Sequence, residues 1–196
     1  MRYQDISADT NPCYRIATSE TVVFFVLNRA GDISLELSHP GARAHVFAFY
    51  TGRGPEKKSL SLKQGHLAPD TVSSATVKTA LDDQASFAYD GTIRISKDAH
   101  RSDARQESRA LLLSPGARAY ARPALEILAH DVKCRHAATA GPPGEESLFF
   151  VTSRGISENA ARKLLTQGFF QETLEQMEKL GVPEDELEKI RSQLFT

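Results

Sequence analysis

The 196-residue sequence contains no tryptophan, only two cysteines and no long apolar run. Cys13 and Cys134 are too few for a disulfide framework, which favours a reducing compartment. The longest apolar run, residues 22–27, is far shorter than the roughly 20 residues that cross a bilayer as a helix. Residues 1–12 are polar and lack the apolar centre of a signal peptide. We therefore expect a cytoplasmic protein without a disulfide scaffold or a membrane helix.

An excess of charge of one sign is also missing. Lysine and arginine total 24, aspartate and glutamate total 25, and the formal net charge is −1. Broad nucleic-acid binding normally requires a clear basic excess, so we expect no nucleic-acid partner. The hydrophobic content of 40% is that of an ordinary globular chain, and the length suits one large domain or one domain with an appendage.

Short strand-like segments dominate residues 14–140. Residues 21–28 are rich in β-branched and aromatic side chains, and Ile33, Leu35 and Leu37 alternate with polar residues. Strands this short, at regular spacing, predict a sandwich, a barrel or a β-solenoid. Several segments lack the two-residue hairpin signals of antiparallel folds, which favours stacked parallel coils without deciding the matter.

Helical periodicity replaces the strand pattern after the Gly-Pro-Pro-Gly turn at residues 141–144. One helix is predicted over residues 145–154, ended by Gly155. A second is predicted to begin after Ser157, which can cap its N-terminus, and a third covers residues 183–195.

These patterns divide the chain into three parts. Residues 1–13 are expected to form a loose N-terminal arm, residues 14–143 a β body, and residues 144–196 a helical C-terminal domain. Within the β body, residues 98–108 are polar and show no strand pattern, so we expect a loop there.

Cys134 and His136 are the candidate site residues, in the motif DVKCRHAAT at residues 131–139. Side chains alternate between the faces of a strand, so Val132, Cys134 and His136 share one face. A thiol beside an imidazole is compatible with a metal-ligand pair, a nucleophile with its base, or two core side chains. The spacing alone leaves these three readings open.

Other polar residues are interpreted more simply. Glu126 is read as a surface charge, with a role as an extra oxygen ligand as the weaker alternative, and Cys13 is read as structural or incidental. Arg154 is placed to bind the last carbonyls of the helix before Gly155. Four further residues are read as solvated turn residues: His66, Asp98, His100 and Asp103.

Three ordered blocks resemble the SufB/SufD family, the scaffold proteins of the SUF iron–sulfur cluster assembly machinery, and SufD more than SufB. The blocks are FAYDGTIRISKDAHRSDARQESRALLLSPGA at residues 87–117, RPALEILAHDVKCRHAAT at residues 122–139, and EESLFFVTSRGIS followed by ARKLLTQGF between residues 145 and 169. Weaker similarity extends back to about Gly31.

The resemblance implies a mainly β fold, a right-handed parallel β-helix followed by a small α-helical C-terminal domain. It implies a non-catalytic scaffold with two partners. A SufB-like paralogue or a second copy pairs through the end of the β-helix, and a SufC-like ABC ATPase docks on the C-terminal helices. We expect residues 183–195 to provide the docking surface, because less of the chain remains to cover them.

The family motif DVKCxH lies near the scaffold–scaffold interface, and its positions match Cys134 and His136. The resemblance implies that these two residues contact a transient iron or iron–sulfur cluster shared with a second chain, with no cofactor permanently bound. Most clusters are held by four protein ligands, so one chain with one motif cysteine and one histidine offers half a site.

The sequence departs from the family in several ways. It is about half the usual length, His130 stands where an acid is usual, and Arg135 and Ala137 are unusual within the motif. Residues 120–125 contain no counterpart of the SufB-type cysteine. A minimal or homodimeric version of the scaffold stays open, as does an interaction module without its own cluster ligands.

Three other activities find less support. The loop at residues 52–59 lacks the GxxxxGK[ST] spacing of a nucleotide-binding loop. A carbohydrate-active β-helix needs paired carboxylates, but the acidic pairs here are adjacent and would face opposite ways on a strand. A thiol hydrolase built on Cys134 and His136 would need an oxyanion loop, and none is evident in the sequence.

Overall fold

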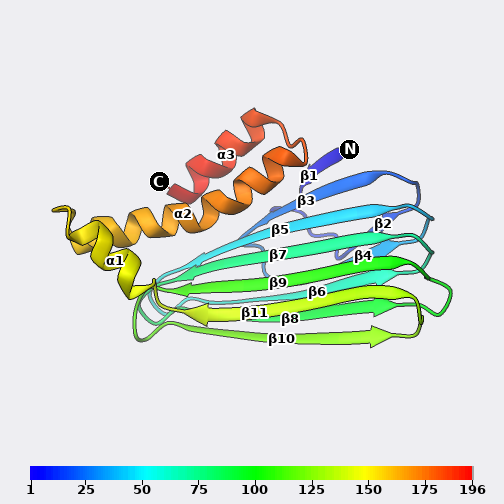
Figure 1. Cartoon of the computed structure of the whole chain (residues 1–196), viewed down its shortest axis with the longest axis horizontal. Coiled ribbons are helices and arrows are strands. Elements are labelled where there is room, and N and C mark those ends of the chain that lie inside the picture. The colour runs from blue at the N-terminus through cyan, green and yellow to red at the C-terminus, as the bar shows by residue number, and fades with distance from the viewer. Residues whose placement is uncertain (196) are drawn as a thin grey trace.

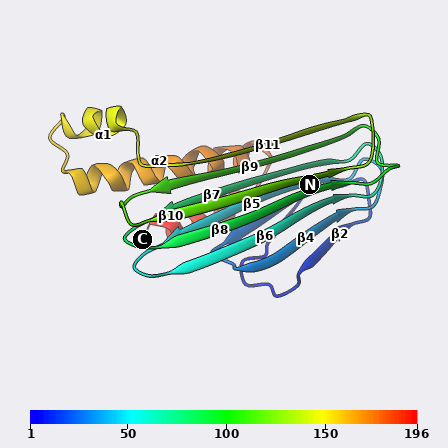
Figure 2. The same cartoon turned by 90° about the horizontal axis from the view of Figure 1, so that it is seen from below.

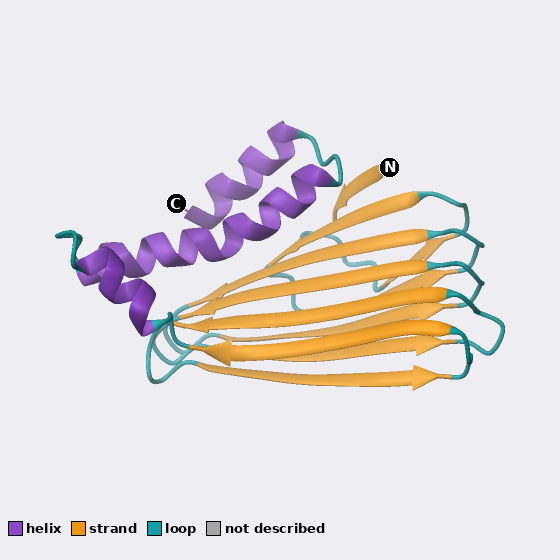
Figure 3. Ribbon diagram, in the orientation of Figure 1, coloured by secondary structure: helices purple, strands orange, loops and turns teal. Residues whose placement is uncertain are grey.

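The computed structural model describes residues 1–195, in which strands precede three helices (Figures 1 and 3). The strands are β1 (Arg2–Asp5), β2 (Cys13–Ile16), β3 (Thr21–Leu27), β4 (Gly31–Leu37), β5 (Arg43–Gly52), β6 (Lys57–His66), β7 (Val72–Leu81), β8 (Ser86–Ile95), β9 (Ser102–Leu112), β10 (Arg118–Ile127) and β11 (Val132–Gly141). The helices are α1 (Glu145–Thr152), α2 (Glu158–Lys179) and α3 (Glu184–Phe195).

The strands form two parallel sheets that face each other (Figure 2). One sheet has the order β1-β3-β5-β7-β9-β11 and the other β10-β8-β6-β4-β2, so from β2 onward the chain alternates between sheets. Two hydrogen-bonded pairs give the length of one coil of the chain. His45 and Ser74 are 29 residues apart, and Asp70 and Arg101 are 31 residues apart. The predicted fold class is confirmed: a parallel β-helix followed by C-terminal helices.

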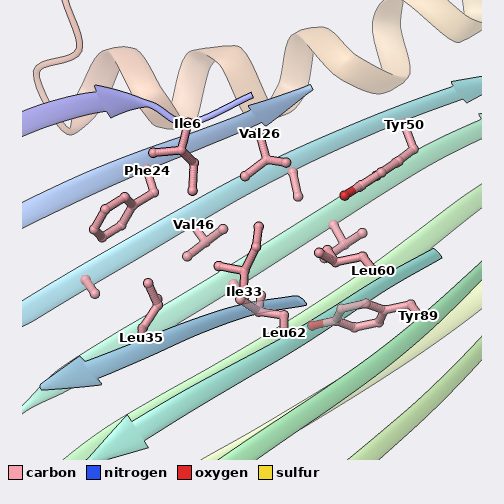
Figure 4. Close-up of a cluster of buried hydrophobic side chains, with 14 of the residues drawn as sticks. Ile6, Phe24, Val26, Ile33, Leu35, Val46, Tyr50, Leu60, Leu62 and Tyr89 are labelled. Carbon is pink, nitrogen blue, oxygen red and sulfur yellow. The ribbon is translucent and has the colours of Figure 1, made fainter. Parts of the chain in front are cut away.

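Strand periodicity explains the core of the N-terminal coils. Ile33, Leu35 and Leu37 of β4 are buried while the residues between them are half-exposed, as their alternation predicted. Apolar side chains of successive coils stack inside the solenoid, with Phe24 and Tyr50 among the largest (Figure 4). Fully burying one such side chain stabilises the fold by about 1.5–3 kcal/mol.

The interior becomes polar in the later coils. Gln64, His66, Ser73 and Gln106 are all buried and joined by hydrogen bonds. Opposite them, Gly91 leaves room for the amide of Gln106, because a Cβ there would lie 2.4 Å from Gln106 Oε1. The prediction of a solvated turn at His66 is wrong, since this residue is fully buried.

The expected loop at residues 98–108 is also wrong, because β9 occupies most of it. The inward side chains of β9 include Ser102, Ala104 and Gln106, and charged residues alternate with them. Small and polar inward residues give no apolar alternation, so the pattern was invisible in the sequence. Asp103 accordingly lies on this strand, half-buried, and accepts hydrogen bonds from Arg105.

The N-terminal segment is more ordered than expected. Residues 2–5 form β1, which pairs in parallel with β3, and Ile6 is buried in the core. The expectation of a loose arm over residues 1–13 is therefore wrong, while the boundary between domains stays a prediction.

Helices α2 and α3 cover the outer face of the sheet that contains β3, β5 and β7 (Figure 1). Phe170 and Leu174 of α2 pack with Phe49 of β5, and α3 adds buried apolar side chains to the same cluster. Lys78 of β7 donates hydrogen bonds of 2.5 Å to the Phe169 carbonyl and to Glu172. No helix within residues 1–195 combines the length and the apolar character needed to span a membrane.

Candidate functional site

Strands β10 and β11 form an open end of the β-helix (Figures 1 and 2). Each pairs with one neighbour only among the described residues, β10 with β8 and β11 with β9. Tyr120 is 60% exposed, and Leu125, Ile127 and Leu128 are exposed with it. Unpaired strand edges beside exposed apolar side chains are typical of a surface that pairs with another chain.

Cys134 lies on β11, in register with Ala104 of β9. Its side chain is partly buried and packs on a small apolar cluster that includes Ile93 and Ile95. Burial, and secondarily the nearby Asp103 carboxylate, raise the pKa of the Cys134 thiol above its ordinary value. The thiol is therefore protonated near neutral pH, and a bound metal ion would have to displace its proton.

His136 lies two residues further along β11, in register with Gln106. The inward positions of the neighbouring strand are buried, whereas His136 is exposed because no further coil covers it. Below it, the side-chain oxygen Oε1 of Gln106 is buried and has no hydrogen-bond partner among the described residues. The open end thus presents one thiol and one imidazole on the strand that closes the stack.

The other candidate ligands do not join this pair. Cys13 is exposed on β2, at the opposite end of the stack from β10. Glu126 of β10 is exposed and lies 3.7 Å from Arg94, as a surface charge would. Within residues 1–195, no group of three or more histidine, cysteine or acidic side chains is arranged to hold a metal ion.

A second exposed surface lies where α1 meets the start of α2. Phe149 is 73% exposed, and Phe150, Ile156 and Leu164 are also exposed. Arg154 donates a hydrogen bond to the Phe150 carbonyl at 2.6 Å, as its position near the helix end predicted, and its guanidinium carbon lies 3.4 Å from the centre of the Phe150 ring. We call these four apolar residues the helix-tip patch.

The final helix differs from the helix-tip patch. Leu187 and Ile190 of α3 are buried against the β-helix cluster, and Leu194 and Phe195 are partly buried in it. The reason given for docking at residues 183–195 was their lack of cover, and that reason is wrong because α2 and the sheet cover their apolar face.

Comparison with known families identifies the family to which the chain belongs. Residues 17–169 match the family described as "SUF system FeS cluster assembly, SufBD core domain", which is most of the chain. This chain belongs to the SufBD family. Both Cys134 and His136 lie within the matched region.

Several curated SufBD relatives are similar to the chain. The iron–sulfur cluster assembly protein SufD of Escherichia coli is 32% identical over 117 residues, covering 60% of this chain and 28% of SufD. SufD of Bacillus subtilis is 31% identical over 131 residues, covering 67% of this chain and 30% of SufD. A SufBD family protein of Mycobacterium leprae is 32% identical over 159 residues, covering 77% of this chain and 40% of the relative. The chain thus spans less than half the length of these relatives.

Sequence reasoning missed the polar interior beneath the SufBD motif. Gln64, Ser73 and Gln106 were passed over because polar residues at alternating positions look like a solvent-facing strand edge. A usable signal existed, since Gln106 stands 30 residues before His136, which is the spacing that the register gives to β9 and β11. Only the register between neighbouring strands shows which polar side chains point into the interior of the β-helix.

Proposed function

We propose that this SufBD chain is a scaffold subunit that supports iron–sulfur cluster formation at an interface with a second scaffold chain, with an ABC-type ATPase as partner. One observation carries the proposal: the matched SufBD region ends its β-helix with an uncovered strand that bears Cys134 and His136. The chain itself supplies ligands and a platform, and ATP hydrolysis belongs to the partner.

The donor set fits half of a cluster site. A thiolate is the preferred protein ligand of iron–sulfur clusters and an imidazole is a known substitute, and such clusters usually require four ligands. Cys134 and His136 supply two. The remaining ligands come from a SufB-like paralogue or a second copy that pairs with β10 and β11, so the cluster is a transient product that is passed on.

Pairing at the open end would also cover the apolar side chains exposed there. Tyr120, Leu125, Ile127 and Leu128 lie on or directly after β10, and Cys134 lies on the neighbouring open edge. A partner that adds strands to these edges satisfies free backbone groups and buries apolar surface in one contact. The thiol would then be enclosed between two chains, which protects a nascent cluster from solvent.

The ATPase is assigned to the helix-tip patch. Exposed aromatic residues such as Phe149 and Phe150 are typical of interface centres, whereas the apolar residues of α3 are already buried.

The test is anaerobic reconstitution with iron and sulfide, with and without the ATPase and a SufB-like partner, followed by visible absorption. We expect Cys134→Ala and His136→Ala to reduce the cluster absorbance, and Cys13→Ala to leave it unchanged. Equal absorbance from wild type and Cys134→Ala, or none from either, would refute the ligand role of Cys134.

The alternative function is a purely structural module of the same complex, without cluster ligands of its own. The partial burial and raised pKa of the Cys134 thiol favour it, because a buried neutral thiol behaves as a small apolar side chain. In that case Cys134→Ala would alter the thermal stability of the complex but not its absorption spectrum.

A further inference from the structure

A groove of about 620 Å³ lies on the outer face of the sheet, beside the C-terminal half of α2. We call it the outer groove. Its walls include Ser74 of β7, Arg105 of β9 and Arg135 of β11 on one side, and Gln176 and Lys179 of α2 on the other. The outer groove and the Cys134 thiol belong to opposite faces of the sheet, because adjacent residues of β11 alternate between its faces.

Positive charge predominates in the outer groove. The lining includes three cationic side chains, those of Arg105, Arg135 and Lys179, and a single acidic one, that of Glu107. Glu107 lies 4.0 Å from Arg109, which is outside the groove. Arg105 is already engaged by Asp103, through hydrogen bonds of 3.1 and 2.9 Å. The side chains of Arg135 and Lys179, by contrast, form no ion pair or hydrogen bond with any residue in the described part of the chain.

The surroundings do not cancel this charge. The hydrogen bond from Arg105 is the main cause of the lowered pKa of Asp103, and Lys133 and Arg135 lower it further, so Asp103 is surrounded by cations. His45, whose Nδ1 lies 2.7 Å from Ser74 Oγ, has a pKa lowered by burial and by Arg43. It is therefore neutral near pH 7 and adds a polar but uncharged neighbour.

The rest of the groove is suited to a polypeptide. Phe47 at its base is almost fully buried, and Ala137 and Leu180 add apolar contact. The free edge of β11, which carries Arg135, offers backbone donors and acceptors alongside. A nucleic acid is disfavoured because the whole chain carries a net charge of −1 and lacks a broad basic surface.

We propose that the outer groove binds an acidic, extended segment of a protein partner, with its carboxylates at Arg135 and Lys179. Charge complementarity selects the partner, and the apolar base accepts the side chains between its acids. The charged contacts at Arg135 and Lys179 need no metal and lie on the face of the sheet opposite the Cys134 thiol, although His136 also lines the outer groove.

The test uses a fluorescein-labelled ten-residue peptide of alternating glutamate and leucine, and fluorescence anisotropy with the whole chain. We expect saturable binding that weakens with added salt, because exposed charges are screened. The double variant Arg135→Glu/Lys179→Glu should bind about tenfold more weakly, since two attractions become repulsions. The matched control Lys57→Glu/Lys63→Glu changes exposed lysines of β6, in the other sheet, and should bind as wild type does.

Several results would overturn the proposal. They are no saturable binding below about 1 mM peptide, unchanged binding by the Arg135→Glu/Lys179→Glu variant, or equal binding of a lysine–leucine peptide. Equal or tighter binding of an oligouridylate of the same charge would point to a nucleic-acid ligand and would also refute it. Circular-dichroism melting confirms that each variant is folded. Because no iron or ATPase is present, the outcome is independent of the cluster-assembly proposal.

Discussion

Mild acid is expected to destabilise the β-helix through His66, which is fully buried among hydroxyl groups. Nδ1 lies 2.7 Å from Thr71 Oγ1 and Nε2 lies 2.8 Å from Ser73 Oγ. Gln64 donates to Ser73 and Thr71 donates to the Ala68 carbonyl, so the network suits a neutral ring that donates from Nδ1 and accepts at Nε2. Protonation would remove the acceptor that the Ser73 hydroxyl uses.

The magnitude follows from the pKa of His66. Burial lowers it to about 4 from an ordinary value of 6.5, and the Asp103 carboxylate offsets part of that effect. The unfolded chain therefore binds the proton first as the pH falls. Stability from neutral His66 is fully present above pH 6.5 and is lost as the pH falls towards about 4. Between pH 7.5 and pH 5, the loss from this residue is about 2 kcal/mol.

Urea denaturation at pH 7.5 and pH 5 measures this loss, and His66→Gln provides the comparison. The variant should lose about 2 kcal/mol less than wild type over this interval, whereas the exposed His39→Gln control should behave as wild type. An NMR titration of the His66 ring gives the pKa directly and needs no substitution. A pKa of 6 or above, or equal pH dependence in wild type and His66→Gln, would refute the reasoning.

Two further predictions concern packing and docking. Gly91→Ala should lower the free energy of unfolding by about 1–3 kcal/mol, because its Cβ would overlap the buried Gln106 amide. Gly141→Ala is the control, because a Cβ at Gly141 meets no atom within 4 Å. If adding Gln106→Ala to the Gly91→Ala variant fails to restore its stability, the clash is not the cause. Phe149→Glu should abolish co-purification with the ATPase without changing the melting temperature, and normal co-purification would exclude the helix-tip patch as the dock.

The fold was predictable to the extent that local patterns could be combined with a family resemblance. Alternation located Ile33, Leu35 and Leu37 on an inward face, and a helix beginning after Ser157 was confirmed, with Ser157 Oγ accepting from the Ala160 N–H. The pattern alone left sandwich, barrel and solenoid open, because it does not encode strand order. Pairing between strands some 30 residues apart is a non-local property, which the resemblance supplied.

The placement of the candidate residues on one strand was predictable, but their surroundings were not. The motif placed Cys134 and His136 on one strand, and the structure places both on β11. Their exposure depends on β11 being an edge, which no local pattern reveals. The cover over α3 was missed for the same reason, since an apolar stripe such as Leu187 and Ile190 does not show what packs against it. The cluster-binding role of Cys134 and His136 stays a prediction.

The parallel coils stack as a one-dimensional series, in which each coil is held by its neighbours. Strand β11 is the last member and hydrogen-bonds to β9 alone, so within residues 1–195 its outer edge has no strand partner. The terminal unit of such a series is its least stable part and opens most readily. A chain that pairs with β11 would steady the position of Cys134 and bring the missing ligands in the same encounter. The fold would then set the order of events, because the metal-binding geometry would become rigid only after the second chain had bound.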